Sequence, residues 1–214
     1  MKITLLCSDA LHPVNGHLAR WMQNNKARHD IVLVRQTKDL PGGDVLFLIS
    51  CTEILRAEDR AGYGASLVLH ASDLPQGRGW SPHIWQIIGG AREITLSLIE
   101  AGERVDSGRI WCQTRFAVPK DALWDEINQR LFDAEIELMD SALQGFDTLV
   151  PREQSPDVAP TYFPRRTPAD SRIDPLQSIA SQFDRIRVCD PQRFPAFFEL
   201  HGCRYTLKLE KVDD

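Results

Sequence analysis

Long apolar runs are absent from this sequence: no stretch of about 18 apolar residues, the length that a membrane-spanning helix needs, occurs in it. The N-terminal stretch meets Ser8 and Asp9 too early for the apolar segment of a signal peptide. Positive charge is also scarce, since 25 Lys and Arg stand against 30 Asp and Glu, a net charge of −5. We therefore expect a cytoplasmic protein with no membrane or nucleic-acid partner, because a nucleic-acid binder usually presents a broad basic surface.

Cysteines and glycine-rich motifs are equally sparse. The five cysteines are far apart and form no CxxC pair, which favours reduced thiols. Cys203 follows His201 by two residues, but no further ligands occur at zinc spacing, so no metal is expected. Neither GxGxxG nor GxxxxGK[ST] occurs after an apolar run, which argues against a dinucleotide site or a P-loop.

What the sequence does contain is short apolar runs alternating with helical patterns. Strands are predicted at residues 1–8, 31–34, 45–49 and 67–69. Residues 18–22 show helical spacing between the first two. This alternation predicts an α/β fold with a mainly parallel sheet and helices on both faces.

The second half changes texture. Residues 122–146 predict one long amphipathic helix, with Asp121 as N-cap and Gly145 near its end. Six of the 13 prolines then fall between Pro151 and Pro175. We therefore expect a core at 1–150 and a proline-rich C-terminal arm at 151–214 packed on it, with a helix at 178–187 and an edge strand at 204–209.

The segment 67–110 carries a dense motif. Its fixed positions are His70, Ser72, Leu74, Pro75, Arg78, Gly79 and Pro82, followed by Asp106 and Gly108. This frame resembles the folate-dependent formyltransferase family, whose signature reads N-x-H-x-S-x-L-P-x-x-R-G-x-x-P with D-x-G further on. The resemblance implies a Rossmann-like, three-layer core, and 10-formyltetrahydrofolate as the formyl donor.

One position departs from that pattern. The asparagine of the signature falls on Val68, whose side chain cannot polarise a formyl oxygen. An oxyanion donor is commonly worth about 3 to 4 kcal/mol, so another group must replace it if the chain is active. Ser72 and Ser97 are the side-chain candidates, and backbone N–H groups or a water are alternatives.

His70 and Asp106 have the chemistry for acid–base work. An amine that attacks a formyl group must lose a proton, and a neutral imidazole suits the acceptor while a carboxylate beside it favours the imidazolium. We predict His70 as the base and Asp106 as its partner. A histidine bonded at a strand end, and an Asx-turn before Ser107, are the structural alternatives.

The resemblance also implies the walls of two binding sites. The donor would be flanked by Cys51, Leu74, Pro75, Arg78, Gly79, Glu100, Gly102 and Val105. For the second substrate we predict contacts from His12, Asn15, Trp80, Ser81, Arg165 and Arg166. The loop at 12–17 could equally be a plain strand-to-helix connection. Arg78 could instead be a structural anchor that pairs with a carboxylate. The arginines of the arm could pair with nearby aspartates instead of phosphates.

The predicted function is an N-formyltransferase acting on the amine of a nucleotide-linked amino sugar. Residues 69–88 and 162–174 of the arm resemble short sugar N-formyltransferases of pseudaminic-type pathways. A formyltetrahydrofolate hydrolase, a purine-pathway formyltransferase and, given Val68, a non-catalytic folate-binding protein are the alternatives. The oligomeric state is left open, with a homodimer as one option.

Overall fold

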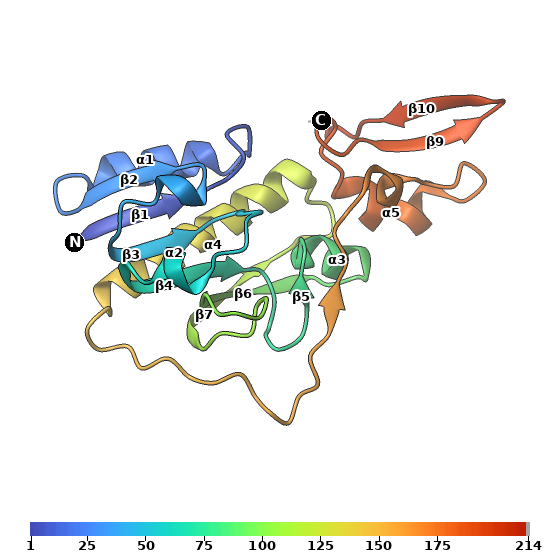
Figure 1. Cartoon of the computed structure of the whole chain (residues 1–214). Coiled ribbons are helices and arrows are strands. Elements are labelled where there is room, and N and C mark those ends of the chain that lie inside the picture. Colours follow the sequence, from blue (N-terminus) through green and yellow to red (C-terminus); the bar gives the residue numbers. More distant parts are fainter. Residues whose placement is uncertain (213–214) are drawn as a thin grey trace.

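A six-stranded sheet forms the centre of the computed structural model, which describes residues 1–212 (Figure 1). In spatial order its strands are β2 (Asp30–Val34), β1 (Lys2–Leu6), β3 (Gly43–Leu48), β4 (Tyr63–His70), β6 (Glu93–Glu100) and β7 (Ile110–Ala117). The pairings from β2 to β4 are parallel, whereas β4–β6 and β6–β7 are antiparallel. The mainly parallel α/β sheet predicted from the sequence is confirmed.

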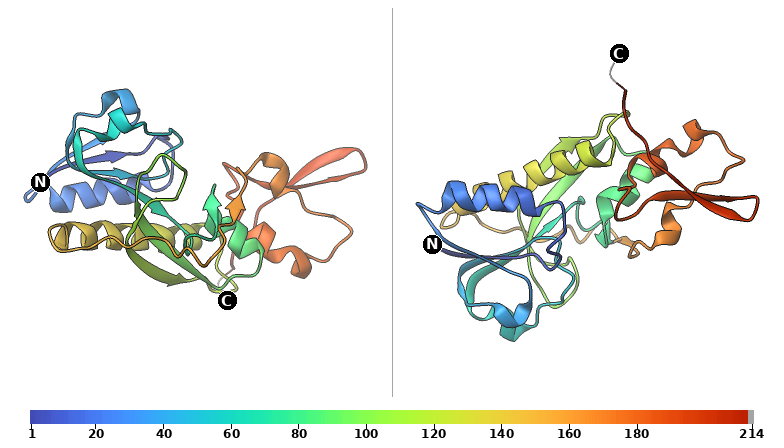
Figure 2. Two further views of the ribbon diagram at one scale, coloured as in Figure 1. Left: turned by 60° about the horizontal axis from the view of Figure 1, so that its bottom comes forward. Right: turned by 90° about the horizontal axis from the view of Figure 1, so that it is seen from above.

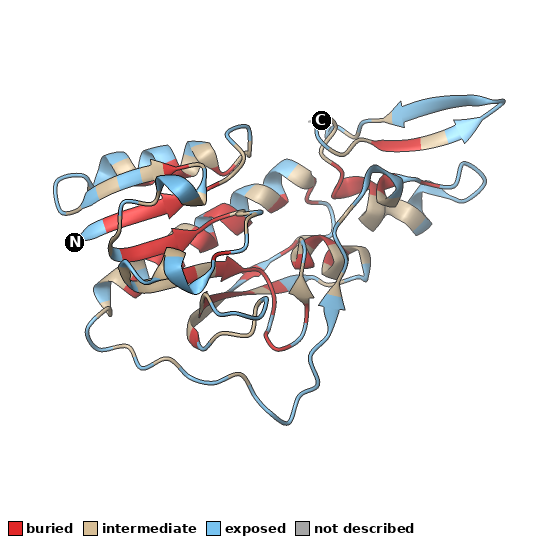
Figure 3. Cartoon of the chain, in the orientation of Figure 1, coloured by how far each residue is buried: buried red, intermediate tan, exposed pale blue. Residues whose placement is uncertain are grey.

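Side chains alternate across the parallel strands and divide the core into two layers. Ile3 and Leu5 of β1 pack in the larger cluster with residues of α1 (Asn15–Asn25) and α4 (Trp124–Gln144). Leu6 points the other way, into a smaller cluster. The 3₁₀ turn Thr37–Asp39 lies in the connection from β2 to β3, and the short α2 (Ala57–Arg60) lies in the connection from β3 to β4. Figure 3 shows the buried residues concentrated on these central strands.

The sequence predicted the start of the long helix wrongly. Asp121 is not its N-cap: the cap is Leu123, whose backbone N–H donates to the Glu126 carboxylate at 2.8 Å. The carboxylate of Glu126, at the third helical position, thus satisfies a free backbone N–H group at the start of the helix. The side chain of Asp121 had been expected to do this. Gly145 does end the helix, as predicted.

The chain after α4 runs along the core as an irregular arm before it folds locally again (Figures 1 and 2). Its elements are β8 (Tyr162–Phe163), the 3₁₀ turn Pro168–Ser171, α5 (Ile179–Arg187), β9 (Ala196–Leu200) and β10 (Cys203–Leu207). The strand expected at 204–209 is β10, which pairs with β9 in a hairpin outside the central sheet. The division of the chain at residue 150 stays a prediction.

The parallel strands end at one edge of the sheet, which is where such folds place their sites. The chain goes from β1 to β2 on one side and then to β3 on the other, so the strand order reverses between β1 and β3. The loop after β4 continues through β5 (Arg78–Gly79) and α3 (Pro82–Ile88). β5 pairs with β8 of the arm, so the arm lies over the loop that carries the motif.

Candidate active site

His70 is the last residue of β4 and is 6% exposed. Its Nε2 lies 2.9 Å from the carbonyl oxygen of Gly77, and its Nδ1 lies 3.5 Å from Asp106 Oδ1. Both partner atoms, the Gly77 carbonyl oxygen and the Asp106 carboxylate oxygen, are hydrogen-bond acceptors. An approaching substrate amine would have to compete with the Gly77 carbonyl for Nε2.

Asp106 comes from the turn between β6 and β7, and its side chain is 10% exposed. One carboxylate oxygen faces His70, while the other accepts from the backbone N–H of Gly79 at 2.8 Å. Its φ of 52° is in the left-handed region. The carboxylate therefore bridges β5 and the end of β4, and the structure brings together the two residues that the motif predicts as base and partner.

The two serines predicted as candidates for the oxyanion donor differ in whether their hydroxyl hydrogen is free. Ser97 Oγ donates to the carbonyl of Ser72 at 2.7 Å and accepts from Gln113 Nε2 at 2.8 Å. Its only hydrogen is therefore in use. Ser72 Oγ, in contrast, is buried and has no hydrogen-bond partner among the described residues. A buried hydroxyl without a partner lowers the stability of the fold, so its presence calls for an explanation such as a role in binding.

Gln154 is a residue of this site that the sequence did not indicate. Its Nε2 donates to the carbonyls of Asp106 at 2.8 Å and Gly108 at 2.9 Å, and its Oε1 accepts from Arg78 Nη2 at 2.6 Å. Arg78 thus has a neutral amide as its partner instead of a carboxylate. Nothing near Gln154 in the sequence signals this contact, because the bonded loops are more than 40 residues away.

Glycines are required where the loops touch. A Cβ on Gly79, whose φ is +99°, would lie 2.3 Å from the carbonyl oxygen of Phe163 in β8. A Cβ on Gly108 would lie 1.8 Å from the carbonyl oxygen of Glu100. The motif glycines therefore permit close backbone approach.

The predicted donor-binding residues occupy varied environments. Leu74 and Pro75 are buried, whereas Gly102 and Val105 are exposed. Glu100 accepts two hydrogen bonds from Arg109, at 2.8 Å each, and one from Trp111, so its carboxylate is committed to its own hairpin.

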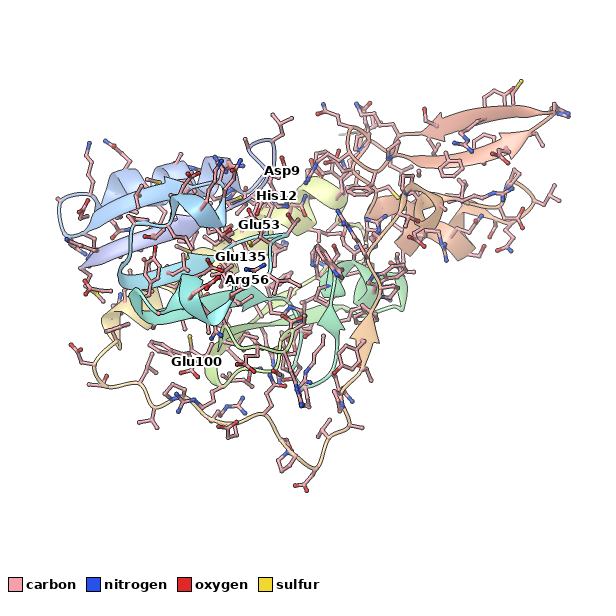
Figure 4. The ribbon with its side chains drawn as sticks, in the orientation of Figure 1. Asp9, His12, Glu53, Arg56, Glu100 and Glu135 are labelled. Carbon is pink, nitrogen blue, oxygen red and sulfur yellow. The ribbon has the colours of Figure 1, made fainter. Side chains whose placement is uncertain are left out.

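Cys51 lies after β3, at the reversal point of the sheet. The Ser8 hydroxyl lies 3.5 Å from its sulfur, and burial raises the pKa of the thiol. The loops after β1 and β3 thus touch here. Figure 4 shows Asp9 and His12 on the loop after β1 and Glu53 after β3, with Glu100 apart from them at the end of β6.

His12 and Asn15 hold the loop after β1. His12 Nδ1 accepts from Val14 N at 3.3 Å, and burial together with the charge of Arg193 lowers the pKa of His12 to about 4. The Asn15 amide donates to three carbonyl groups of the loop and accepts from Arg35 at 2.7 Å. Asn15 is therefore fully engaged, and His12 is neutral at pH 7.

The two arginines of the arm that were predicted to contact the second substrate lie in different environments. The Arg165 guanidinium is exposed and lies 4.9 Å from the centroid of the Trp80 ring. Arg166 donates to Ser171 Oγ at 3.1 Å, and its Nε is buried without a partner among residues 1–212. Ser81 begins α3 in the left-handed conformation with no side-chain cap.

His83, in the first turn of α3, was not predicted. Its Nδ1 is buried and unpaired within the described chain, and burial, then Arg166, lowers its pKa to about 3. Gln86, one turn later on the same face, donates to the carbonyl of Ala71 at 3.0 Å. Because Ala71 follows His70, this bond ties α3 to the end of β4. A histidine directly after Pro82, in the first turn of a mainly apolar helix, was the available signal.

Two features are absent from the part of the chain that the structure describes. No helix within residues 1–212 is long and apolar enough to cross a membrane. The same residues contain no group of three or more His, Cys, Asp or Glu side chains placed to hold a metal ion.

Solved structures share this fold. The chain is similar to a methionyl-tRNA formyltransferase from Clostridium thermocellum, with a TM-score of 0.81 and 22% identity over 95% of this chain and 90% of that one. It is also similar to HypX from Aquifex aeolicus in complex with tetrahydrofolic acid, at TM-score 0.79 and 19% identity, covering 95% of this chain and 36% of that one. A sugar N-formyltransferase from Shewanella matches at TM-score 0.74 and 14% identity, over 100% and 99% of the two chains.

The comparison of sequences identifies the family of the chain as well as its fold. Residues 23–143, more than half of the 214, match the family model described as formyl transferase. That segment contains His70, Ser72 and Asp106, the residues gathered in the site above. The chain therefore belongs to the formyl transferase family and is a formyltransferase.

Proposed function

We propose that this protein moves a formyl group from 10-formyltetrahydrofolate to the amine of a nucleotide-linked amino sugar. The observation that carries the proposal is the His70–Asp106 pair, in which the last residue of β4 lies 3.5 Å from a carboxylate of the turn between β6 and β7. The folate-derived donor is supported by the family match and by the likeness to HypX in complex with tetrahydrofolic acid.

The donor supplies an activated formyl carbon, and the chain's residues supply proton handling and charge stabilisation. His70 accepts the proton that the amine loses as the new C–N bond forms, and the Asp106 carboxylate stabilises the imidazolium that results. His70 then returns this proton to the leaving nitrogen of tetrahydrofolate as the bond from that nitrogen to the formyl carbon breaks. One observation fits the binding of such a formyl donor: the hydroxyl of Ser72 is buried without a hydrogen-bond partner among the described residues. Ser72 lies beside Gly77, whose carbonyl contacts His70. Val68 stands where the family signature has an asparagine. We assign to Ser72 the donation of a hydrogen bond to the formyl oxygen in its place, because Ser97 has no free hydrogen.

The choice of an amino sugar rests on charge and on the arm. With a net charge of −5 the chain lacks the basic surface that a tRNA acceptor needs. The likeness to a sugar N-formyltransferase over almost the whole of both chains supports a sugar acceptor. Arg165, exposed beside Trp80, is available for a phosphate of the nucleotide.

The test is incubation of the pure protein with 10-formyltetrahydrofolate and a panel of nucleotide-linked amino sugars, including pseudaminic-type precursors. We expect one of them to gain a formyl group, detected by mass spectrometry. His70→Ala and Asp106→Asn should each lower kcat about 100-fold or more, the usual scale for acid–base groups. Wild-type rates in either variant would remove the assigned roles.

The same mixture separates the alternatives. Formate release that no amine accelerates would favour a hydrolase. Formylation of glycinamide ribonucleotide, with no reaction of any sugar, would favour the purine pathway. Retained folate binding without any turnover would mean that Val68 has abolished the activity of the family.

A further inference from the structure

The side chain of Gln154 connects the arm to both loops that surround Asp106. Its amide N–H groups donate to the Asp106 and Gly108 carbonyls, at 2.8 and 2.9 Å, and its carbonyl accepts from Arg78 at 2.6 Å. The donors of the amide are thus both used on one turn. No other side chain of the described arm bonds to the backbone of this turn.

The backbone around Gln154 is itself fixed. Two residues earlier, Arg152 forms a bridge with Ile110 of β7, with N–O distances of 2.9 and 2.7 Å in the two directions. This bridge sets the path of the arm across the start of β7. Gln154 is therefore half-buried over the Asp106 turn instead of being part of a freely moving loop.

Asp106 needs such support, because it is not a glycine and yet has a φ of 52°. Left-handed backbone is strained for a residue with a Cβ and persists where surrounding contacts hold it. In this conformation the carboxylate reaches the Gly79 N–H and His70 Nδ1 together. Relaxation of the turn would move the carboxylate away from His70.

We infer that Gln154 is a positioning residue of the formyl-transfer reaction: by bonding the carbonyls of Asp106 and Gly108, it holds the Asp106 carboxylate against His70. This inference rests on the roles proposed above for His70 and Asp106, and not on the identity of the acceptor. It makes the arm a part of the active site.

Two variants separate the bonds of Gln154. Gln154→Met keeps the length of the side chain and removes all three hydrogen bonds. Gln154→Glu retains an acceptor for Arg78 but has no N–H for the two carbonyls. Glu153→Met is the matched control, since Glu153 is the exposed neighbour in the same segment.

The first readout needs no acceptor: the ring ¹⁵N resonances of His70 at pH 7, with Asp106→Asn as the reference for loss of the carboxylate. We expect Gln154→Met and Gln154→Glu to shift these resonances in the same direction as Asp106→Asn, and Glu153→Met to leave them in place. Thermal melts verify that each variant is folded, and Gln154→Glu serves if Gln154→Met is not. Unshifted resonances in a folded Gln154 variant would overturn the inference.

The second readout is a double-mutant cycle on turnover. Gln154→Met should lower kcat about tenfold or more in the wild-type background, with the KM for the folate donor unchanged, because misplacement of a catalytic group slows chemistry. In the Asp106→Asn background it should have no further effect. An equal loss in both backgrounds would show that Gln154 acts by another route.

The outcomes distinguish this inference from the proposed acceptor. If no nucleotide-linked amino sugar reacts, the proposed acceptor fails while the resonance comparison still decides the role of Gln154. If Asp106→Asn itself leaves the His70 resonances unchanged, the proposed contact between Asp106 and His70 is wrong, and the inference falls with it.

Discussion

Arg187 and Glu135 are ionisable side chains buried in this protein, the first with a counter-charge and the second without one. Arg187, whose side chain is 0% exposed, pairs with Asp184 at 2.6 Å and donates to two carbonyl groups. Glu135 on α4 is 6% exposed, and its Oε2 has no partner among the described residues (Figure 4). A buried carboxylate without a counter-charge takes up a proton, and burial raises the pKa of Glu135 to about 8.

This raised pKa predicts a pH-dependent stability. The folded state holds the Glu135 proton more firmly than the unfolded chain, so the contribution of this group is present below the ordinary carboxyl pKa and is lost as the pH rises towards 8. Glu135→Gln should remove this loss and raise the free energy of unfolding by about 2 to 4 kcal/mol at pH 7. Urea unfolding at pH 5, 7 and 8 measures it, with the exposed Glu137→Gln as control. A difference that does not grow with pH would contradict the prediction.

Of the residues that lie around His70, the sequence indicated those that belong to the motif. His70 and Asp106 were predictable because the frame from Ser72 to Gly108 accompanies them. Gln154 could not be found, since a glutamine in a proline-rich segment has no pattern, and its role depends on how the arm crosses the core. His83 was overlooked for a similar reason: the burial of its Nδ1 depends on how α3 packs in the fold.

At the scale of elements, the parallel strands were predictable, and the short pairing of β5 with β8 was not. Residues 45–49 and 67–69 are continuous apolar runs, typical of strands buried on both faces, and they fall at β3 and within β4. β5 and β8 have two residues each and about 80 residues between them. Their pairing depends on tertiary contact, because an isolated two-residue strand has no sequence signal.

Gly79→Ala tests the close approach of these strands. The new Cβ would lie 2.3 Å from the Phe163 carbonyl, so β8 must move away and release the Trp80 N–H that bonds this carbonyl at 3.2 Å. We expect faster amide hydrogen exchange at Trp80 and a lower Tm. Gly90→Ala is the matched control, because Gly90 has a similar φ of +95° but nothing within 4 Å of the added Cβ. The backbone strain of about 1 kcal/mol should be common to both variants, so equal effects would sink the idea.

At the scale of the whole molecule, the C-terminal part is attached to the core by contacts far apart in the chain. Arg187 of α5 donates to the carbonyls of Pro119 and Ala122, at 3.0 and 2.9 Å, just before α4 begins. Arg193 bonds Asp9 at 2.6 Å in the loop after β1. The sequence indicated that the arginines of the arm could pair with nearby aspartates, which holds for Arg187 and Asp184. It could not indicate that the same guanidinium also joins two parts of the fold.

Arg187 and Arg92 allow this attachment to be measured, because both pair with the carboxylate of Asp184. Arg187 is fully buried, whereas the Arg92 side chain is 39% exposed and water can replace its contact. Arg187→Met should lower the free energy of unfolding by about 3 kcal/mol, since it leaves two carbonyl groups and part of a carboxylate without their buried donor. Arg92→Met should change it little. In urea, Arg187→Met should also lose the amide hydrogen-exchange protection of α5 and β9 before that of the central strands. Equal effects of the two substitutions, or a single shared transition in Arg187→Met, would mean that other contacts hold the C-terminal part in place.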